Sequence, residues 1–186
     1  MGLGIQLHLV LPAWVAEGCD LESPYDDDDM MALAIGLSRR NIEAGTGGPF
    51  GAAIFGPDRR LLAVGVNHVL ASHCSLAHAE ALACMLAQQG LQRARLNELG
   101  GPYTLATSAQ PCCQCYGALV WAGIDRLLVG ARAEDVMALT DFDEGPLPAD
   151  WVGELERRGI EVQRDLQRDA ACAVLQDYIK SGGPSY

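Results

Sequence analysis

The chain has 186 residues, of which 49% are hydrophobic and 20% are charged, and its formal net charge is -11. This length and composition favour one globular domain that buries about 70% of the surface of its unfolded chain. A surface of this sign repels phosphate, so a nucleic-acid partner would require a strong basic groove. The scattered pairs Arg39-Arg40, Arg59-Arg60 and Arg157-Arg158 do not form such a groove. The sequence therefore indicates a small-molecule partner and argues against nucleic acid.

The cysteines and the N-terminal segment indicate where the protein works. The chain has seven cysteines, an odd number, and no signal peptide precedes them, which fits a reducing cytoplasm better than a disulfide framework. The first 16 residues are apolar in parts, but they lack a basic start and Pro12 interrupts them. Such a segment is too short to span a bilayer. We expect a cytoplasmic protein without a membrane partner, in which residues 1–25 extend a single domain of residues 1–186.

The hydrophobic pattern predicts alternating helices and strands along the chain. In chain order, we predict a helix over 27–44, strands over 51–55 and 61–69, a helix over 77–89, a strand over 103–108, a helix over 111–122, a strand over 125–130, a helix over 133–139, a loop over 140–149, a helix over 151–158, a strand over 160–166 and a helix over 168–179. The Gly56-Pro57-Asp58 turn predicts a hairpin. The run Asp26 to Asp29 fits the first turn of the first helix, where acidic side chains meet the positive end of the dipole. The sum is an α/β fold with a mixed sheet and helices on its faces.

The segment Pro111-Cys112-Cys113-Gln114-Cys115 has the spacing of a metal site at a helix start. Pro111 fits the first helical turn because it has no N–H to lose and its φ is already helical. Cys112 and Cys115 then lie on one helix face, and the positive end of the dipole favours their thiolates. Cys113 is turned about 100° away from them, and we interpret it as a small buried apolar residue.

A third ligand, His78, lies about thirty residues earlier in His78-Ala79-Glu80. Three ligands fit a catalytic zinc ion, whereas a closed structural site has four. A position left to water lets zinc lower the pKa of that water from about 15.7 to about 7. The Glu80 carboxyl group is suited to carry protons from the water to a ring nitrogen and a departing amine. The alternatives are a structural zinc site closed by Cys74, and two unrelated segments.

Together, these motifs resemble the cytidine deaminase-like superfamily, and they are most similar to its bacterial guanine deaminase branch. The resemblance covers residues 42–186 and is carried by Gly47-Gly48-Pro49-Phe50-Gly51-Ala52-Ala53, Asn67, His78-Ala79-Glu80, Thr107-Ser108-Ala109, Pro111-Cys112, Cys115 and Gly117-Ala118. It implies a three-layer fold with a five-stranded mixed sheet between helices. It also implies one zinc per subunit, held by His78, Cys112 and Cys115, with Glu80 catalytic.

The resemblance further implies a homodimer, in which residues 140–186 of one subunit can complete the pocket of the other. Tyr186, the last residue, can cap the partner's pocket. Trp121 lies on the helix of the cysteines, on a different face from Cys112, and we interpret it as a core or dimer-interface residue.

The contacts with a base are implied in the same way. Asn67 would hydrogen-bond the base, the backbone N–H of Ala79 would contact it, and Phe50 would pack against its ring. Residues 141–145 stand in the place of an acidic substrate loop, in which Glu144 would be the main catalytic acceptor and Asp143 the second. A carboxylate there can accept from a ring N–H and an exocyclic amine, which favours guanine. The alternatives are a turn residue for Asn67, plain core for Phe50 and a solvated loop for 141–145.

The expected function is hydrolytic deamination of free guanine to xanthine and ammonia. Gln110 stands where many relatives have Glu, and Cys74-Ser75-Leu76 replaces a common Asp-Pro-Thr, which loosens the match to any one substrate. The alternatives are another small aminated heterocycle (cytosine, a guanine nucleoside or an aminotriazine such as ammeline), a tRNA adenosine deaminase, and a zinc-binding module without turnover.

Overall fold

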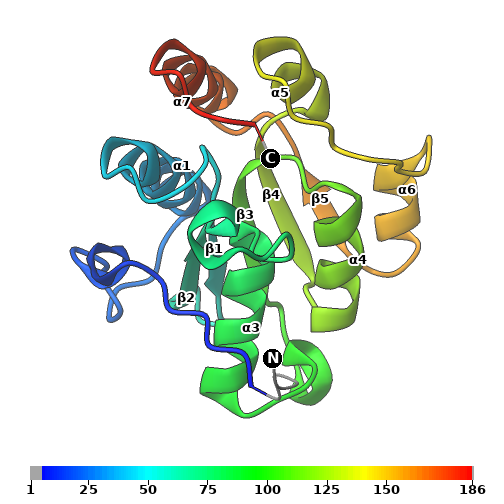
Figure 1. The fold of residues 1–186 in the computed structure, drawn as a ribbon. Helices are drawn as coiled ribbons and strands as arrows, with labels where there is room; N and C mark the ends of the chain where they lie inside the picture. The colour runs from blue at the N-terminus through cyan, green and yellow to red at the C-terminus, as the bar shows by residue number, and fades with distance from the viewer. Residues whose placement is uncertain (1–5, 186) are drawn as a thin grey trace.

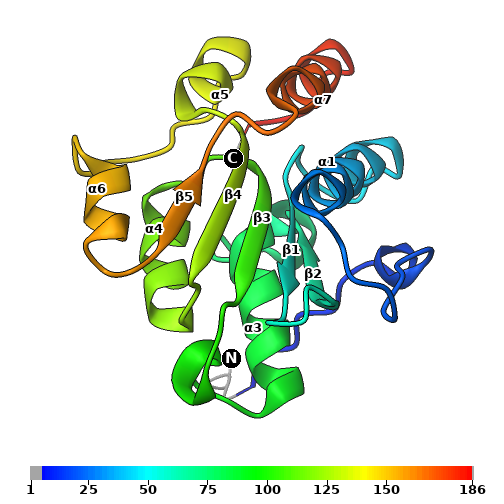
Figure 2. The same cartoon turned by 180° about the vertical axis from the view of Figure 1, so that it is seen from behind.

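The structure, a computed structural model, describes residues 6–185, which form a five-stranded mixed sheet between two layers of helices (Figures 1 and 2). Tyr186, which we expected to cap a partner's pocket, lies outside the described residues. Within residues 6–185, no helix has the length and apolar character needed to cross a bilayer. The expected three-layer fold is confirmed.

The strands lie in the order β2-β1-β3-β4-β5. Their bounds are β1 Gly51–Phe55, β2 Leu61–Val66, β3 Thr104–Ala109, β4 Arg126–Ala131 and β5 Glu161–Gln163. Strand β1 is antiparallel to β2 and β3, whereas β3, β4 and β5 are parallel. The predicted hairpin is confirmed, because the N–H of Gly56 donates to the carbonyl of Arg60 across the turn between β1 and β2.

Helices cover both faces of the sheet. One face carries α1 (Asp27–Glu43), α5 (Ala133–Leu139) and α7 (Arg168–Lys180), and the other carries α3 (Ala79–Leu91), α4 (Cys113–Ala122) and α6 (Trp151–Glu156). Short elements join them: η1 (Ala13–Ala16), α2 (Val69–Ser72) and η2 (Leu96–Leu99). The acidic run begins α1 as expected, and Asp26 caps this helix by accepting the N–H of Asp29.

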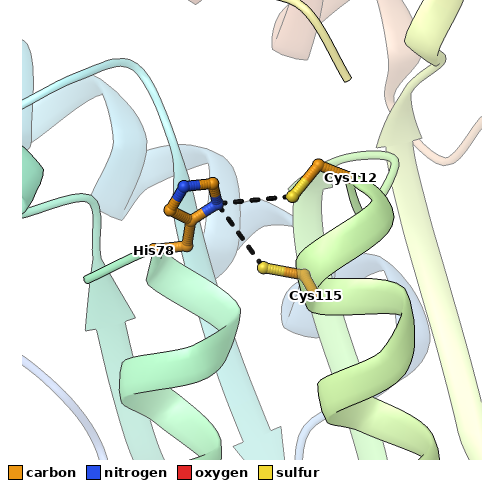
Figure 3. A group of neighbouring side chains, drawn as sticks. All are labelled: His78, Cys112 and Cys115. Atoms are coloured by element: carbon orange, nitrogen blue, oxygen red, sulfur yellow. Dashed lines mark hydrogen bonds between the residues drawn. The ribbon is translucent and has the colours of Figure 1, made fainter. Parts of the chain in front are cut away.

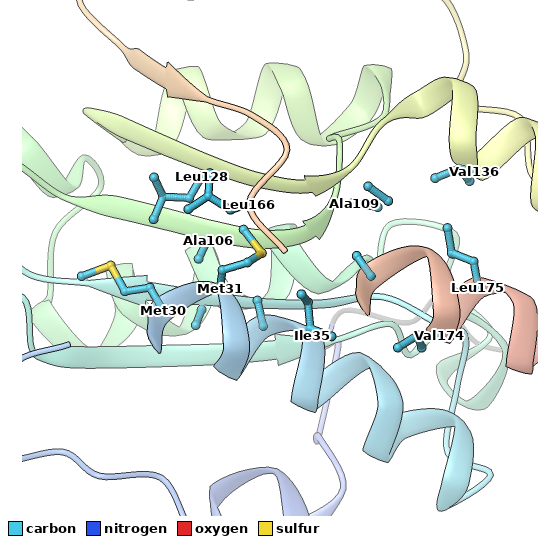
Figure 4. Close-up of a cluster of buried hydrophobic side chains, with 14 of the residues drawn as sticks. Met30, Met31, Ile35, Ala106, Ala109, Leu128, Val136, Leu166, Val174 and Leu175 are labelled. Atoms are coloured by element: carbon cyan, nitrogen blue, oxygen red, sulfur yellow. The ribbon is translucent and has the colours of Figure 1, made fainter. Parts of the chain in front are cut away.

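The core lies on both faces of β3, whose six residues are all buried. Because side chains alternate along a strand, Ala106 packs toward α1 and Leu105 toward α3 and α4. Figure 4 shows the hydrophobic cluster between the sheet and helices α1, α5 and α7, in which Met31 of α1 and Leu175 of α7 pack over the sheet. Burial on both faces explains why β1 and β4 are nearly continuous apolar runs.

Several predicted boundaries differ from the structure, among them those of α3, α4, β2 and β5. Helix α4 begins at Cys113, and Pro111 is not in its first turn, because Gln110 still donates its N–H to Ala131 in the sheet. Strand β2 ends at Val66 because Asn67 forms a turn there, with its side chain accepting the N–H of Val69. Helix α3 begins after His78, which caps it, and β5 is shorter than predicted.

Candidate metal centre and pocket

Three ligand atoms converge at the starts of α3 and α4 (Figure 3). The Nδ1 atom of His78 lies 3.4 Å from the Cys112 sulfur and 3.6 Å from the Cys115 sulfur. A tetrahedral zinc ion with ordinary Zn–S and Zn–N bonds places such atoms about 3.6 Å apart, so this set fits zinc. Cys74 does not belong to this cluster of the described residues, which disfavours the closed structural site.

Two helix starts position these ligands. His78 is the N-cap residue of α3, Cys112 is the N-cap residue of α4, and Cys115 lies in the first turn of α4. Both cap residues have extended backbone, and this lets their side chains turn toward each other. The positive ends of both helix dipoles therefore point toward the sulfurs and stabilise negative charge on them.

The two thiols share one negative charge. A hydrogen bond from Cys115, and to a smaller extent the neighbouring His78, lower the pKa of the Cys112 thiol to about 4. The same pairing raises the pKa of Cys115, because a second thiolate beside the first is unfavourable. A divalent cation is the partner that makes a second deprotonation favourable.

Glu80 lies in the first turn of α3, beside the ligand set. Its side chain is buried, with 7% exposed. Burial raises the pKa of its carboxyl group, and the charge of Cys112 raises this pKa further. A carboxyl group whose pKa moves toward neutrality can both accept and release a proton at working pH.

A single pocket brings most of the expected site residues together. It is lined by Phe50, Asn67, His78, Glu80, Gln110, Cys112, Phe142, Asp143 and Glu144. Ala79 is buried at the start of α3, and its side chain does not line this pocket. The pocket lies where β3 and β4 end, the edge at which α/β sheets commonly bind ligands.

The acidic loop is tied to the start of α4. The N–H of Cys113 donates to the carbonyl of Glu144 at 2.9 Å, and the N–H of Gly145 donates to Asp143 Oδ1 at 2.9 Å. Glu144 is only 7% exposed, so the alternative of a solvated side chain is wrong for this residue. Burial, and to a smaller extent the charges of Cys112 and Glu80, raise the pKa of Glu144 to about 8.

Two interpretations of single residues need correction. Cys113 is exposed, not buried, because one position beyond the cap of α4 its side chain points outward, toward Gly145. Gly145 has a φ of 68°, and a side chain there would collide with the Cys113 sulfur. Trp121 is 78% exposed, so it is not a core residue of this subunit, and an interface role stays a prediction.

A buried residue that sequence reasoning missed supports the pocket. Asn41 of α1 is fully buried, and its Nδ2 donates to the carbonyls of Gly48 and Asn67, each at 2.9 Å. The Thr46 hydroxyl donates to Asn41 Oδ1 at 2.7 Å. A side chain at Gly47 would collide with the carbonyl of Asn67, so the chain needs glycine there. An amide on the otherwise apolar face of the first helix was the available signal.

Aromatic rings form one side of the pocket. Phe142 meets Phe50 edge to face at 5.2 Å and stacks on Tyr178 of α7 at 6.1 Å. Phe50 therefore both packs in the core and lines the pocket, so the two interpretations of this residue are compatible.

Comparison with known proteins places this site among the deaminases. Residues 24–131 match the family described as the cytidine and deoxycytidylate deaminase zinc-binding region. The chain is similar to the solved guanine deaminase from Nitrosomonas europaea, at 41% identity and a TM-score of 0.85 over 96% of this chain and 98% of that one. A structure of NE0047 in complex with 2,6-diaminopurine matches at 42% identity and a TM-score of 0.87 over 97% and 96%. Guanine deaminase of Bacillus subtilis (strain 168) is 36% identical over 117 residues, which are 63% of this chain and 71% of that protein.

Proposed function

Because the chain belongs to the family of the cytidine and deoxycytidylate deaminase zinc-binding region, we propose that it is a zinc-dependent hydrolase that deaminates guanine. Guanine and water would give xanthine and ammonia: a C–O bond forms at the carbon that bears the amino group, and its C–N bond breaks. The observation that carries the proposal is one pocket that joins a three-ligand metal set to two buried carboxyl groups. Similarity to guanine deaminases supports the choice of base.

The residues divide the chemistry among them. His78, Cys112 and Cys115 would hold one zinc ion, which when bound supplies the activation of a water molecule. Glu80 would take the proton of that water and deliver protons to the ring nitrogen and the departing amine. Its burial keeps the carboxyl group away from bulk water while it holds the proton.

Recognition of the base is assigned to other residues that line the same pocket. Glu144 would accept from a ring N–H and an exocyclic amine, the paired donors of guanine. Asp143 contributes less, since its Oδ1 already accepts the N–H of Gly145. Asn67 would donate to the base through Nδ2, because its Oδ1 accepts the N–H of Val69. Phe50 would contact the ring face or edge.

A substrate panel tests this proposal. Guanine, guanosine, cytosine, adenine and ammeline are incubated with the zinc-loaded protein, and ammonia release is measured, with Glu80→Ala as the control. We expect release from guanine well above that from the other compounds and none from the variant. Preferential release from another compound would contradict guanine as the substrate. A tRNA substrate is disfavoured by the net charge of -11.

The proposal extends to assembly and location. Four exposed apolar residues lie on or beside α3 and α4: Leu76, Met85, Leu86 and Trp121. This surface supports a homodimer, which light scattering at micromolar concentration would detect. All seven cysteines are unpaired, which supports a reducing, cytoplasmic location.

A further inference from the structure

Gln110 lies in the pocket wall but has no part in metal binding or proton transfer. It follows β3 directly, is 5% exposed, and lines the pocket together with Glu80 and Glu144. Its backbone N–H donates to the carbonyl of Ala131 at the end of β4, at 2.8 Å. The sheet therefore sets the position from which this side chain enters the pocket.

The orientation of the Gln110 amide follows from the start of α5. The N–H of Ala133, the first residue of α5, donates to Gln110 Oε1 at 3.4 Å. An N–H donor can face only the oxygen of an amide, so the nitrogen Nε2 is turned to another side. Two buried side-chain nitrogens of the described residues lack a partner, His68 Nδ1 and Arg164 Nε. Gln110 Nε2 is not one of them, and no hydrogen bond joins it to another described residue, so this nitrogen keeps some exposure, and Gln110 lines the pocket.

Asn67 has the same arrangement on another element, since its Oδ1 accepts the N–H of Val69 at 3.4 Å. Each amide thus has its oxygen occupied by the protein's own backbone and its N–H₂ group available. The pocket offers two neutral donors, from Asn67 and Gln110, besides the carboxyl groups of Glu80 and Glu144. A heterocycle that carries both acceptors and donors matches such a wall.

We propose that Gln110 is a specificity-determining residue, whose Nε2 donates a hydrogen bond to an acceptor atom of the bound base. The guanine ring system offers three such acceptors, namely the carbonyl oxygen O6 and the ring nitrogens N7 and N3. Bases without an acceptor at the contacted position leave a buried donor unpaired and bind more weakly. This inference rests on the proposed function in that guanine is the base used to test it.

The substitution Gln110→Met removes the donor and keeps the length of the side chain. We expect kcat/KM for guanine to fall about tenfold, mainly through KM, because one neutral hydrogen bond to the base is lost. Gln89→Met, at an exposed position of α3, is the matched control and should stay within about twofold of the parent protein. Zinc content and melting temperature report whether each variant is folded and loaded. A folded Gln110→Met protein within about twofold of the parent would overturn the inference.

Two further arms separate contact with the base from support of α5. Gln110→Glu keeps an oxygen that can accept the N–H of Ala133, but it loses the amide donor. At alkaline pH its kcat/KM for guanine should therefore fall by at least as much as that of Gln110→Met. This variant also replaces Gln110→Met in the test if Gln110→Met does not fold. The analogues 7-deazaguanine, 3-deazaguanine and 2-aminopurine lack N7, N3 and O6, respectively, and they are compared by their dissociation constants, because loss of N3 or of the N1–H also changes turnover by itself. The penalty of the variant should fall below about twofold for one of them. An equal tenfold penalty with guanine and all three analogues would mean that Gln110 acts only through α5.

Failure of the proposed function gives a different result. In that case the parent protein would release no ammonia from guanine and would act on another compound of the substrate panel. The pair Gln110→Met and Gln89→Met would then be compared on that compound. A difference of less than about twofold between the two variants would still overturn the role of Gln110.

Discussion

Two buried carboxyl groups, those of Glu80 and Glu144, line the pocket, and their surroundings differ enough to support different proposed roles. Glu80 follows His78 by two residues, so the start of α3 presents both a metal ligand and the proposed proton carrier. Glu144 comes from a loop and reaches the pocket because its carbonyl is held by the N–H of Cys113. The first placement is local in sequence, whereas the second depends on a contact between distant segments.

Glu80→Gln keeps the shape of the side chain and removes its ability to carry a proton. We expect ammonia release from guanine to fall by a factor of about 10² to 10⁴, the usual contribution of a general acid or base. Bound zinc, measured by elemental analysis, should stay at one ion per chain. Turnover close to that of the parent protein would show that another group carries the proton.

Glu144→Gln replaces a carboxyl group, which would pair with the two donors of guanine in its ionised form although burial raises its pKa, by an amide of the same size. We expect kcat/KM for guanine to fall by about 10- to 100-fold, because a charge-assisted pair with the ring N–H and amine is lost, with zinc content unchanged. Asp143→Asn is the comparison, and its loss should be smaller because Asp143 Oδ1 is engaged by Gly145. Equal activity of Glu144→Gln and the parent protein would remove Glu144 from substrate recognition.

At the scale of elements, the close packing of β2 against α3 fixes the metal site. Gly65 of β2 lies against the first turn of α3, where an added Cβ would collide with the carbonyl of Ala79 and lie 2.8 Å from the backbone nitrogen of Ala83. His78 caps the same helix end. The position of the imidazole therefore depends on a glycine in a neighbouring strand.

Gly65→Ala should therefore destabilise the fold and disturb zinc binding. We expect the free energy of unfolding in urea to fall by about 3 kcal/mol, since backbone atoms cannot move aside as a flexible side chain can. Gly90→Ala, in the same helix but with open space around it, should raise it by about 0.5 kcal/mol through its helix propensity. A Gly65→Ala protein as stable as the parent would show that α3 can shift without cost.

At the scale of the whole molecule, α5 and α7 are held together by a partly exposed ion pair. Arg168 of α7 donates through Nε to Asp135 Oδ2 at 2.7 Å, and the N–H of Arg132 donates to the same oxygen at 2.8 Å. These hydrogen bonds, with that of Arg168 the largest cause, lower the pKa of Asp135 to about 2. Helix α7 carries Tyr178, which stacks on Phe142 of the pocket, and the start of α5 donates a hydrogen bond to Gln110. The ion pair between α5 and α7 therefore supports the pocket from the face of the sheet opposite α3 and α4.

Because folding lowers the pKa of Asp135, this carboxylate adds to the free energy of unfolding at pH values above its unfolded pKa of about 4. The contribution is lost as the pH falls from about 4 toward about 2. Asp135→Asn should therefore lower the free energy of unfolding by about 1 to 2 kcal/mol at neutral pH, after allowance for solvent screening. The difference between parent and variant should shrink as pH falls through this window, which urea titrations at several pH values would measure. A difference that is the same at neutral and acidic pH would rule out the ion pair as its source.

The sequence by itself determined the ligand set, the order of the elements and the zinc deaminase family, whereas the role of Glu80 as proton carrier stays a prediction. These features are local, because a cap residue, a turn or a three-residue helical spacing is defined by neighbours along the chain. Only the tertiary structure decided that Glu144 is buried, that Cys113 and Trp121 are exposed, and that Asn41 and Gln110 support the pocket. It also decided that α4 begins after Pro111. The physical reason is that burial and the partner of a polar group depend on segments far apart in sequence, which the sheet alone brings together.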